Sequence, residues 1–194
     1  IATAGGALGA AIGVVTNIIT TDHSTGVVVT GTSTDKSSLT GTSVSVDADA
    51  KEGISSLLIA ASGAQYAAVS ASVNVNRQLS DVSAAVDQTE VLGSFAQNAN
   101  YLGRITTSAI TAAGSQYAAV PISVVINYAD NAVSSSVAHS ILRAEGQSAS
   151  VGANRISEFS SLNVTASGAM YGAVAGLVNV NTIEGATSAE VNDS

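Results

Sequence analysis

Hydrophobic and polar residues alternate along much of this chain with a period of two. Between Gly63 and Asn76 the alternation divides the side chains into two sets. One set is Val69, Ala71, Val73 and Val75, and the other is Ser70, Ser72, Asn74 and Asn76. Because successive side chains of a β-strand point to opposite faces, the pattern predicts a half-buried strand with the valine set inward. An α-helix is the alternative for the Ala-rich stretches, but Val, Ser, Thr and Asn are poor helix formers and each copy contains glycine.

The alternating pattern belongs to an internal repeat. Three segments align without gaps: ASGAQYAAVSASVNVN (61–76), AAGSQYAAVPISVVIN (112–127) and ASGAMYGAVAGLVNVN (166–181). A weaker copy, ATAGGALGAAIGVVTN, covers residues 2–17. The copies end at Asn17, Asn76, Asn127 and Asn181, which are 59, 51 and 54 residues apart. A period that varies by a few residues indicates variable loops on a fixed, stacked scaffold.

The repeat extends to both sides of these segments. Ten residues beyond each terminal asparagine stand Val27, Val86, Val137 and Val191, and four residues before each glycine of the last three copies stand Ile59, Ile110 and Val164. Columns of this kind predict an all-β parallel β-solenoid (a β-helix) with repeats of about 51 to 59 residues. We expect one continuous section over residues 1–194, with repeats of roughly 1–60, 61–111, 112–165 and a partial 166–194.

The dimensions of the coil follow less directly from the repeat. A coil of about 20 residues would place three coils in each repeat and nine or ten in the chain, a rod of about 45 Å at the usual strand spacing. Two larger coils per repeat are also compatible with the period. We expect Asn17, Asn76, Asn127 and Asn181, with Asn74 and Asn179, to stack at solenoid corners as a structural amide ladder.

Composition excludes several classes of site. The 194 residues include no Cys, which removes disulfides, zinc-thiolate sites and cysteine nucleophiles. Six Lys and Arg against fourteen Asp and Glu give a net charge of -8, so we expect no nucleic-acid partner. The chain has no apolar run of the length that spans a bilayer, so we do not expect a membrane-spanning protein. Since it begins at Ile1 in an Ala/Gly run, we expect a fragment of a longer protein.

Few residues suggest catalysis or metal binding. His23 and His139 are the two histidines, and we interpret His139 as a polar residue at a strand end. Asp47, Asp49 and Glu52 resemble part of a calcium loop, but Lys51 occupies the fifth position, so we expect a solvated turn. The other acidic and basic residues that we considered are scattered: Asp22, Asp35, Asp81, Asp130 and Glu184, and Arg77, Arg104, Arg143 and Arg155. We therefore expect no catalytic residue, no cofactor and no metal.

Tyrosine recurs at one repeat position, as Tyr66, Tyr117 and Tyr171. Each tyrosine lies an odd number of residues from the valine set, which places its side chain on the opposite face of a strand. The rings are therefore expected to project outward. Such a column could form a binding stripe, because aromatic rings offer a large contact area. The alternative is that each ring only covers a neighbouring coil.

The runs GALGAAIGVVTN, SVNVN and GLVNVNTIEGATSAEV resemble the repeats of filamentous-haemagglutinin-like adhesins, including leukotoxin-type filamentous adhesins, of bacterial two-partner secretion. The resemblance covers almost the whole chain and concerns the style of the repeat. It implies a right-handed β-helix shaft at the bacterial cell surface, exported through an outer-membrane secretion transporter. It also implies a role in adhesion or biofilm, with a receptor or glycan on a host or bacterial surface as partner.

The expected function is therefore a structural shaft segment of a secreted surface adhesin, without enzymatic activity. A carbohydrate-active β-helix enzyme, a polysaccharide lyase or hydrolase, is the first alternative. It would need acids and basic residues gathered in one groove. A passive glycan- or ice-binding solenoid is the second, and it would need a flat, regular array of Tyr or Thr.

Overall fold

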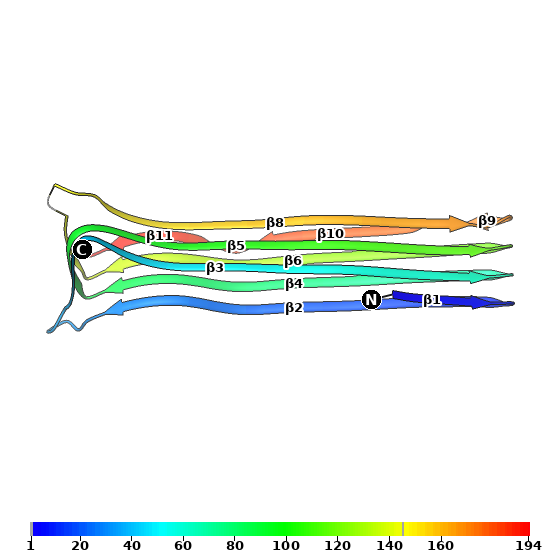
Figure 1. The fold of residues 1–194 in the computed structure, drawn as a ribbon, viewed down its shortest axis with the longest axis horizontal. Helices are drawn as coiled ribbons and strands as arrows, with labels where there is room; N and C mark the ends of the chain where they lie inside the picture. The colour runs from blue at the N-terminus through cyan, green and yellow to red at the C-terminus, as the bar shows by residue number, and fades with distance from the viewer. Residues whose placement is uncertain (1, 145) are drawn as a thin grey trace.

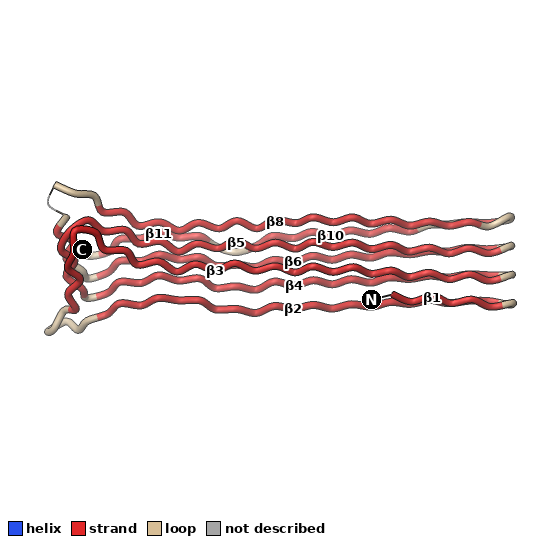
Figure 2. The backbone as a smooth tube through the Cα atoms, viewed as in Figure 1, coloured by secondary structure: helices blue, strands red, loops and turns tan. Residues whose placement is uncertain are grey.

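The computed structural model describes residues 2–144 and 146–194, and the described residues form long parallel strands with no helix (Figures 1 and 2). The strands are β1 (Ala2–Ala7), β2 (Ala10–Thr30), β3 (Ser37–Ala64), β4 (Ala67–Asp87), β5 (Thr89–Ser115), β6 (Ala118–Ala138), β7 (Ile141–Arg143), β8 (Ala149–Gly168), β9 (Gly172–Ala173), β10 (Gly176–Glu184) and β11 (Thr187–Asn192). Six of them reach 20 to 28 residues, far beyond the usual strand of about 5 or 6.

The chain alternates between two sheets. One sheet has the order β1-β3-β5, with β7 and β8 both paired to β5, and the other has the order β2-β4-β6, with β9, β10 and β11 paired to β6. Every pairing is parallel and joins a strand to the strand one full turn later. The chain therefore winds as a parallel β-solenoid, which confirms the predicted fold class.

Each repeat forms one coil, so the expectation of about three short coils per repeat is wrong. A coil consists of one long strand in each sheet, such as β3 followed by β4, and the next coil is β5 followed by β6. At about 3.3 Å per residue a 27-residue strand spans roughly 90 Å, whereas stacked strands lie only about 4.8 Å apart. The long dimension of the molecule thus follows the strands, and the coils stack across it (Figure 1).

Equivalent repeat positions share one column, as the sequence predicts. Val86 pairs with Val137 and Val137 with Val191, while Ile59 pairs with Ile110 and Ile110 with Val164. The weak first copy is misplaced by two residues in the sequence alignment. Asn17 lies beside Asn74 rather than Asn76, and Val29 rather than Val27 lies beside Val86.

The extra residues of the longer repeats lie at one end of the coil. Six residues, Gly31–Lys36, connect β2 to β3, whereas Gln88 alone connects β4 to β5. A bulge between Thr40 and Ser43 adds one more residue to β3. In the last coil the additional residues fall between Arg143 and Ala149. The opposite turns keep a short, nearly constant length of two or three residues.

The valine set of 69–75 faces outward, contrary to the predicted orientation. Val69, Ala71, Val73 and Val75 are half-buried on the outside of β4. The alternate side chains point between the two sheets and are fully buried: Ser70, Ser72, Asn74 and Asn76. A buried polar group is tolerated only when it is hydrogen-bonded, so this half of the interior depends on polar pairing between the sheets.

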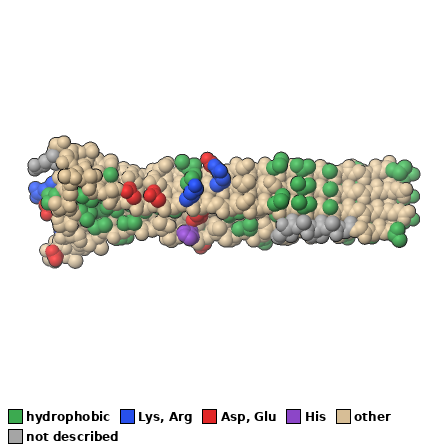
Figure 3. All heavy atoms as spheres, viewed as in Figure 1, with side chains coloured by type: hydrophobic (Ala, Val, Ile, Leu, Met, Phe, Trp, Pro, Cys, Tyr) green, Lys and Arg blue, Asp and Glu red, His purple; other side chains and the backbone are tan. Residues whose placement is uncertain are grey.

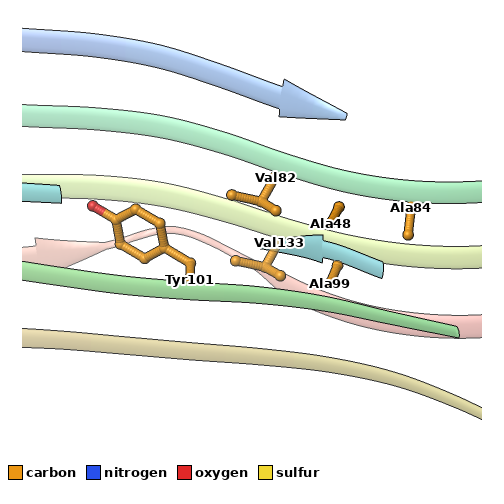
Figure 4. Packing of buried hydrophobic residues seen from close by; sticks show 6 residues of the cluster. All are labelled: Ala48, Val82, Ala84, Ala99, Tyr101 and Val133. Carbon is orange, nitrogen blue, oxygen red and sulfur yellow. The ribbon is translucent and has the colours of Figure 1, made fainter. Parts of the chain in front are cut away.

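The other half of the interior is more apolar, although Gln78 and Gln97 are also buried there. Figure 4 shows one of its clusters, in which Val82, Ala84 and Val133 of one sheet meet Ala48, Ala99 and Tyr101 of the other. A second cluster, around Phe95, Val86 and Val137, closes the end of the coil that carries the longer loops. Small side chains predominate because the two sheets lie close together.

Left-handed backbone marks the corner between the sheets. Gln88, His139 and Asp193 occupy equivalent corner positions and have φ values of 49°, 47° and 49°. A few residues further on, Gly93 has φ +118°, and a Cβ there would lie 1.8 Å from the carbonyl oxygen of Gly41 in the preceding coil. Only glycine allows the two coils to approach this closely at the corner.

Candidate functional site

The three repeat tyrosines form one stack at the turn edge of the solenoid. Tyr66 lies in the turn between β3 and β4, Tyr117 between β5 and β6, and Tyr171 between β8 and β9. The ring centroids of Tyr66 and Tyr117 are 5.4 Å apart with planes inclined by 14°, and those of Tyr117 and Tyr171 are 5.1 Å apart and inclined by 11°. We call these three residues the tyrosine ladder.

Backbone hydrogen bonds between consecutive turns set the spacing of the ladder. The amide of Ala118 donates to the carbonyl of Tyr66 at 3.1 Å, and that of Gly172 donates to the carbonyl of Tyr117 at 3.0 Å. The amide of Ala67 donates in the same way to the carbonyl of Gly9 at 3.4 Å, so a glycine occupies the tyrosine position in the first coil. The ladder therefore begins at Tyr66.

The rings cover one another and also remain accessible. Their exposed fractions are 54%, 46% and 75% in chain order, with the central ring the least exposed. Stacking uses the ring faces between coils, so the ladder presents ring edges and hydroxyl groups outward and a free face at the Tyr171 end. Leu8 and Met170, each one residue before the tyrosine position of its coil, add exposed apolar side chains beside the ladder. A strip of aromatic edges with regularly spaced hydroxyls can contact a sugar ring or another extended ligand by apolar contact and hydrogen bonding.

The repeat asparagines form a buried ladder inside the solenoid. Asn76 Nδ2 donates to Asn127 Oδ1 at 2.8 Å, and Asn127 Nδ2 donates to Asn181 Oδ1 at 2.8 Å. Asn17 does not join this column, because its Nδ2 donates to Asn74 Oδ1 at 3.1 Å. The ladder lies in the middle of long strands, so the expected corner position is wrong.

Hydroxyl groups of the opposite sheet complete the network. Asn76 and Asn127 both bond Thr107 Oγ1 at 2.9 Å, and Asn127 donates to Ser161 Oγ at 2.8 Å. A second set of contacts, Asn74 to Ser56 and Ser72 to Thr111, also crosses between the sheets. These side chains are buried among protein groups, so their role is to hold the two sheets together.

The residues considered for calcium do not converge. Asp47 and Asp49 lie on the outer face of β3, where Asn98 and Asn100 of the next coil donate to them at 2.8 Å. Hydrogen bonds from Ser45 and Asn98 lower the pKa of Asp47. Glu52 points to the inner side, and the segment is strand rather than the expected turn. Within the described residues no three His, Asp or Glu side chains gather at one place.

Glu52 belongs instead to an interior polar group next to Tyr101. Both of its carboxylate oxygens are buried, as are Tyr101 Oη, Gln78 Nε2 and Ser80 Oγ. Burial, together with the neighbouring Glu52 carboxylate, raises the pKa of Tyr101 to about 12. Gly103 provides the room, since a Cβ at this position would lie 2.5 Å from Tyr101 Oη.

The remaining charges are spread over the surface. His139, at the corner, contacts Asp87 at 3.0 Å, whereas His23 lies in β2 beside Ser80. Arg104 pairs with Glu158 at 2.6 Å and Arg143 with Glu90 at 2.8 Å, between successive coils of one sheet. Figure 3 shows charged side chains over one part of the visible face and rows of hydrophobic side chains over another.

Four of the five acids noted in the sequence lie in one sheet. Asp22, Asp81, Asp130 and Glu184 lie in strands of the β2-β4-β6 sheet, and Asp35 lies in the loop before β3. Tyr128 Oη donates to Glu184 at 2.9 Å, which raises the pKa of Tyr128, and the Arg77 guanidinium lies 5.7 Å from the centre of the Tyr128 ring. Arg155 points inward toward the backbone carbonyls of Asn131 and Glu184.

Comparison with known proteins adds no relative, because no family model, curated protein or solved structure matches this chain. Nor do the described residues contain a helix that could cross a membrane.

Proposed function

We propose that this chain is a section of the shaft of a filamentous bacterial surface adhesin. The observation that carries the proposal is the register: three successive pairs of long strands stack with each repeat position beside its equivalent in the next coil. A scaffold of this kind adds coils without changing its cross-section, as an extended shaft requires. The resemblance of SVNVN and GLVNVNTIEGATSAEV to filamentous-haemagglutinin-like repeats supports the same function.

Contact with a receptor or glycan is assigned to the tyrosine ladder. It lies in the turns, where side chains are accessible, and it repeats once per coil. The buried asparagine ladder holds the scaffold together and makes no contact with a ligand. The proposal assigns the chain no catalytic activity, and it places the protein outside the cell, exported by an outer-membrane transporter.

Surface labelling of the source bacterium tests the shaft proposal. Antibodies raised against residues 1–194 should label intact cells, and external protease should remove the signal while a cytosolic marker remains. Deletion of the gene should reduce attachment to host cells or the formation of biofilm. Labelling that appears only after the cells are permeabilised would overturn the proposal.

The assignment of the ladder is tested separately in the full-length protein. Replacement of Tyr66, Tyr117 and Tyr171 by alanine should reduce attachment at unchanged surface display. The matched control replaces Asp47, Asp49 and Lys51, which are exposed on the outer face of β3, by alanine. Equal attachment by the two variants would remove the ladder from the proposal.

A further inference from the structure

The outer face of the β2-β4-β6 sheet carries an apolar zone next to the tyrosine turns. We call it the valine face and define it by Ile12, Val14, Ile18, Val69, Ala71, Val73, Val75, Val120, Ile122, Val124, Ile126, Val178 and Val180. Only Thr16 and Gly176 interrupt it, and no charged residue lies within it. Ile12 is 73% exposed, Ile18 68% and Val178 49%.

This zone is unusual for a parallel sheet. All-parallel sheets are ordinarily covered on both faces, and their strands are correspondingly apolar on both sides. Here sheet packing covers the inner face, which is largely polar in this half of the molecule, and leaves the apolar side chains in solvent. Contiguous exposed apolar patches of a few hundred Å² are often functional.

We propose that the valine face is a self-association surface, on which a second copy of this chain packs face to face. The side chains of the face stand in rows at the strand spacing of about 4.8 Å, and a second copy presents rows of the same spacing and composition. A two-fold axis parallel to the strands places the valine face of one copy against the valine face of the other. A closed, isologous dimer results.

The available area fits this partner. Four strands and seven residues along each strand give an apolar zone of roughly 19 Å by 23 Å, or about 440 Å². The whole outer face, with strands of about 21 residues, measures roughly 1,300 Å². A standard interface buries about 800 Å² on each partner, with an apolar centre and a polar rim. The valine face supplies such a centre, and the polar part of the same sheet supplies a rim.

The rim predicts how the association depends on salt. Asp22, Asp81, Asp130 and Glu184 lie on the outer side of this sheet, with Arg77 as the basic residue among them. In the two-fold arrangement acidic rims approach each other and repel. Screening of this repulsion should strengthen the dimer as the salt concentration rises, as it should also strengthen apolar contact.

Analytical ultracentrifugation of the chain tests the proposal. The wild type should show a concentration-dependent species of twice the 19.0 kDa monomer mass, formed more readily in 500 mM than in 50 mM NaCl. Val73→Lys, at the centre of the valine face, should weaken association at least tenfold. Thr106→Lys is the matched control, because Thr106 is also half-buried and outward-facing, and it lies in the opposite sheet on a strand with neighbours on both sides.

A milder pair of variants covers the case in which Val73→Lys does not fold, as judged by circular dichroism. The chain has no cysteine, so Val73→Cys and Thr106→Cys each introduce a single thiol. A bismaleimide of about 10 Å, the distance between packed sheets, should link the first variant into dimers and not the second.

Three results would overturn the proposal. The first is a monomer at every concentration up to several hundred micromolar. The second is a dimer that Val73→Lys leaves unchanged, which would indicate stacking through the strand edges. The third is a monomer that binds phosphatidylcholine vesicles through Val73, which would identify a membrane as the partner. None of these depends on the adhesin proposal, because the measurement uses the isolated chain.

Discussion

Asn76 and Asn127 are 51 residues apart in the sequence, and the amide of the first donates to the amide oxygen of the second at 2.8 Å. Both side chains are fully buried. The pair links consecutive coils, while Thr107 and Ser161 link the same amides to the opposite sheet. Hydrogen bonds between amide and hydroxyl groups therefore connect the coils and the two sheets in this half of the interior.

Asn127→Ala should destabilise the protein strongly. The change removes contacts with Asn76, Thr107, Ser161 and Asn181 and leaves several buried partners unsatisfied, so we expect a loss of about 2–4 kcal/mol. Urea denaturation followed by circular dichroism measures the change. Asn179→Ala, at an exposed position, should cost less than about 0.5 kcal/mol. Similar losses for the two variants would show that the network contributes little.

Gly93→Ala should prevent the corner from closing. The added Cβ would overlap the Gly41 carbonyl oxygen, and φ +118° is unfavourable for alanine, so we expect a loss of about 3 kcal/mol or more. Gly53→Ala is the control, because a Cβ there meets only the Arg104 carbonyl at 3.9 Å. Thermal unfolding should separate the two variants clearly. A wild-type melting temperature for Gly93→Ala would contradict the close approach of the coils.

Tyr101 should make stability fall at high pH. Its pKa is about 12 in the folded protein and about 10 in the unfolded chain, so the folded state favours the protonated hydroxyl. The stabilisation is complete below about pH 10 and is lost as the pH rises through about 12. Denaturant titrations between pH 8 and 12 should show this loss in the wild type and a smaller one in Tyr101→Phe. Parallel curves for the two proteins would exclude Tyr101 as the cause.

Tyr117→Ala should cost more stability than Tyr171→Ala. The central ring stacks on two neighbours and the terminal ring on one. Each stacked pair contributes about 0.5–1.5 kcal/mol, so the central substitution should cost about twice as much as the terminal one. Chemical denaturation of both variants tests this ratio. Equal costs would mean that the rings contribute as independent exposed side chains.

The repeat made the columns predictable from sequence, because stacking places like residues together. The Tyr66, Tyr117 and Tyr171 column, and the pairing of Val86 with Val137, follow from the alignment alone. The register of Asn17 did not, because the six-residue loop and the bulge add residues between the first copy and the second. The sequence from Thr30 to Ser43 is polar and typical of a loop, but it does not show where the loop ends and the strand begins.

Two other features lie beyond what alternation can determine. The first is the length of the strands, which reaches 20 to 28 residues. The alternation does not show whether a repeat forms one long coil or several short ones. The second is the choice of the buried face of β4, where the prediction places the valine set inward. Ser72 and Asn76 alternate with Val73 and Val75, and the alternation alone does not indicate which set is buried. A shift of the strand register by one residue exchanges the two faces completely. The residues that decide which face is buried, such as Thr107 and Ser56, come from other strands.

The great width of each coil determines how a shaft made from such coils would deform. With strands of roughly 90 Å and two sheets about 10 Å apart, the cross-section is a thin blade rather than a circle. Such a filament flexes readily through its thin direction and resists bending in its broad plane, so electron micrographs should show smooth curvature in one plane only. An adhesive structure of this shape can lie flat against a surface. The narrow edge that carries the tyrosines then runs along the whole length of the filament.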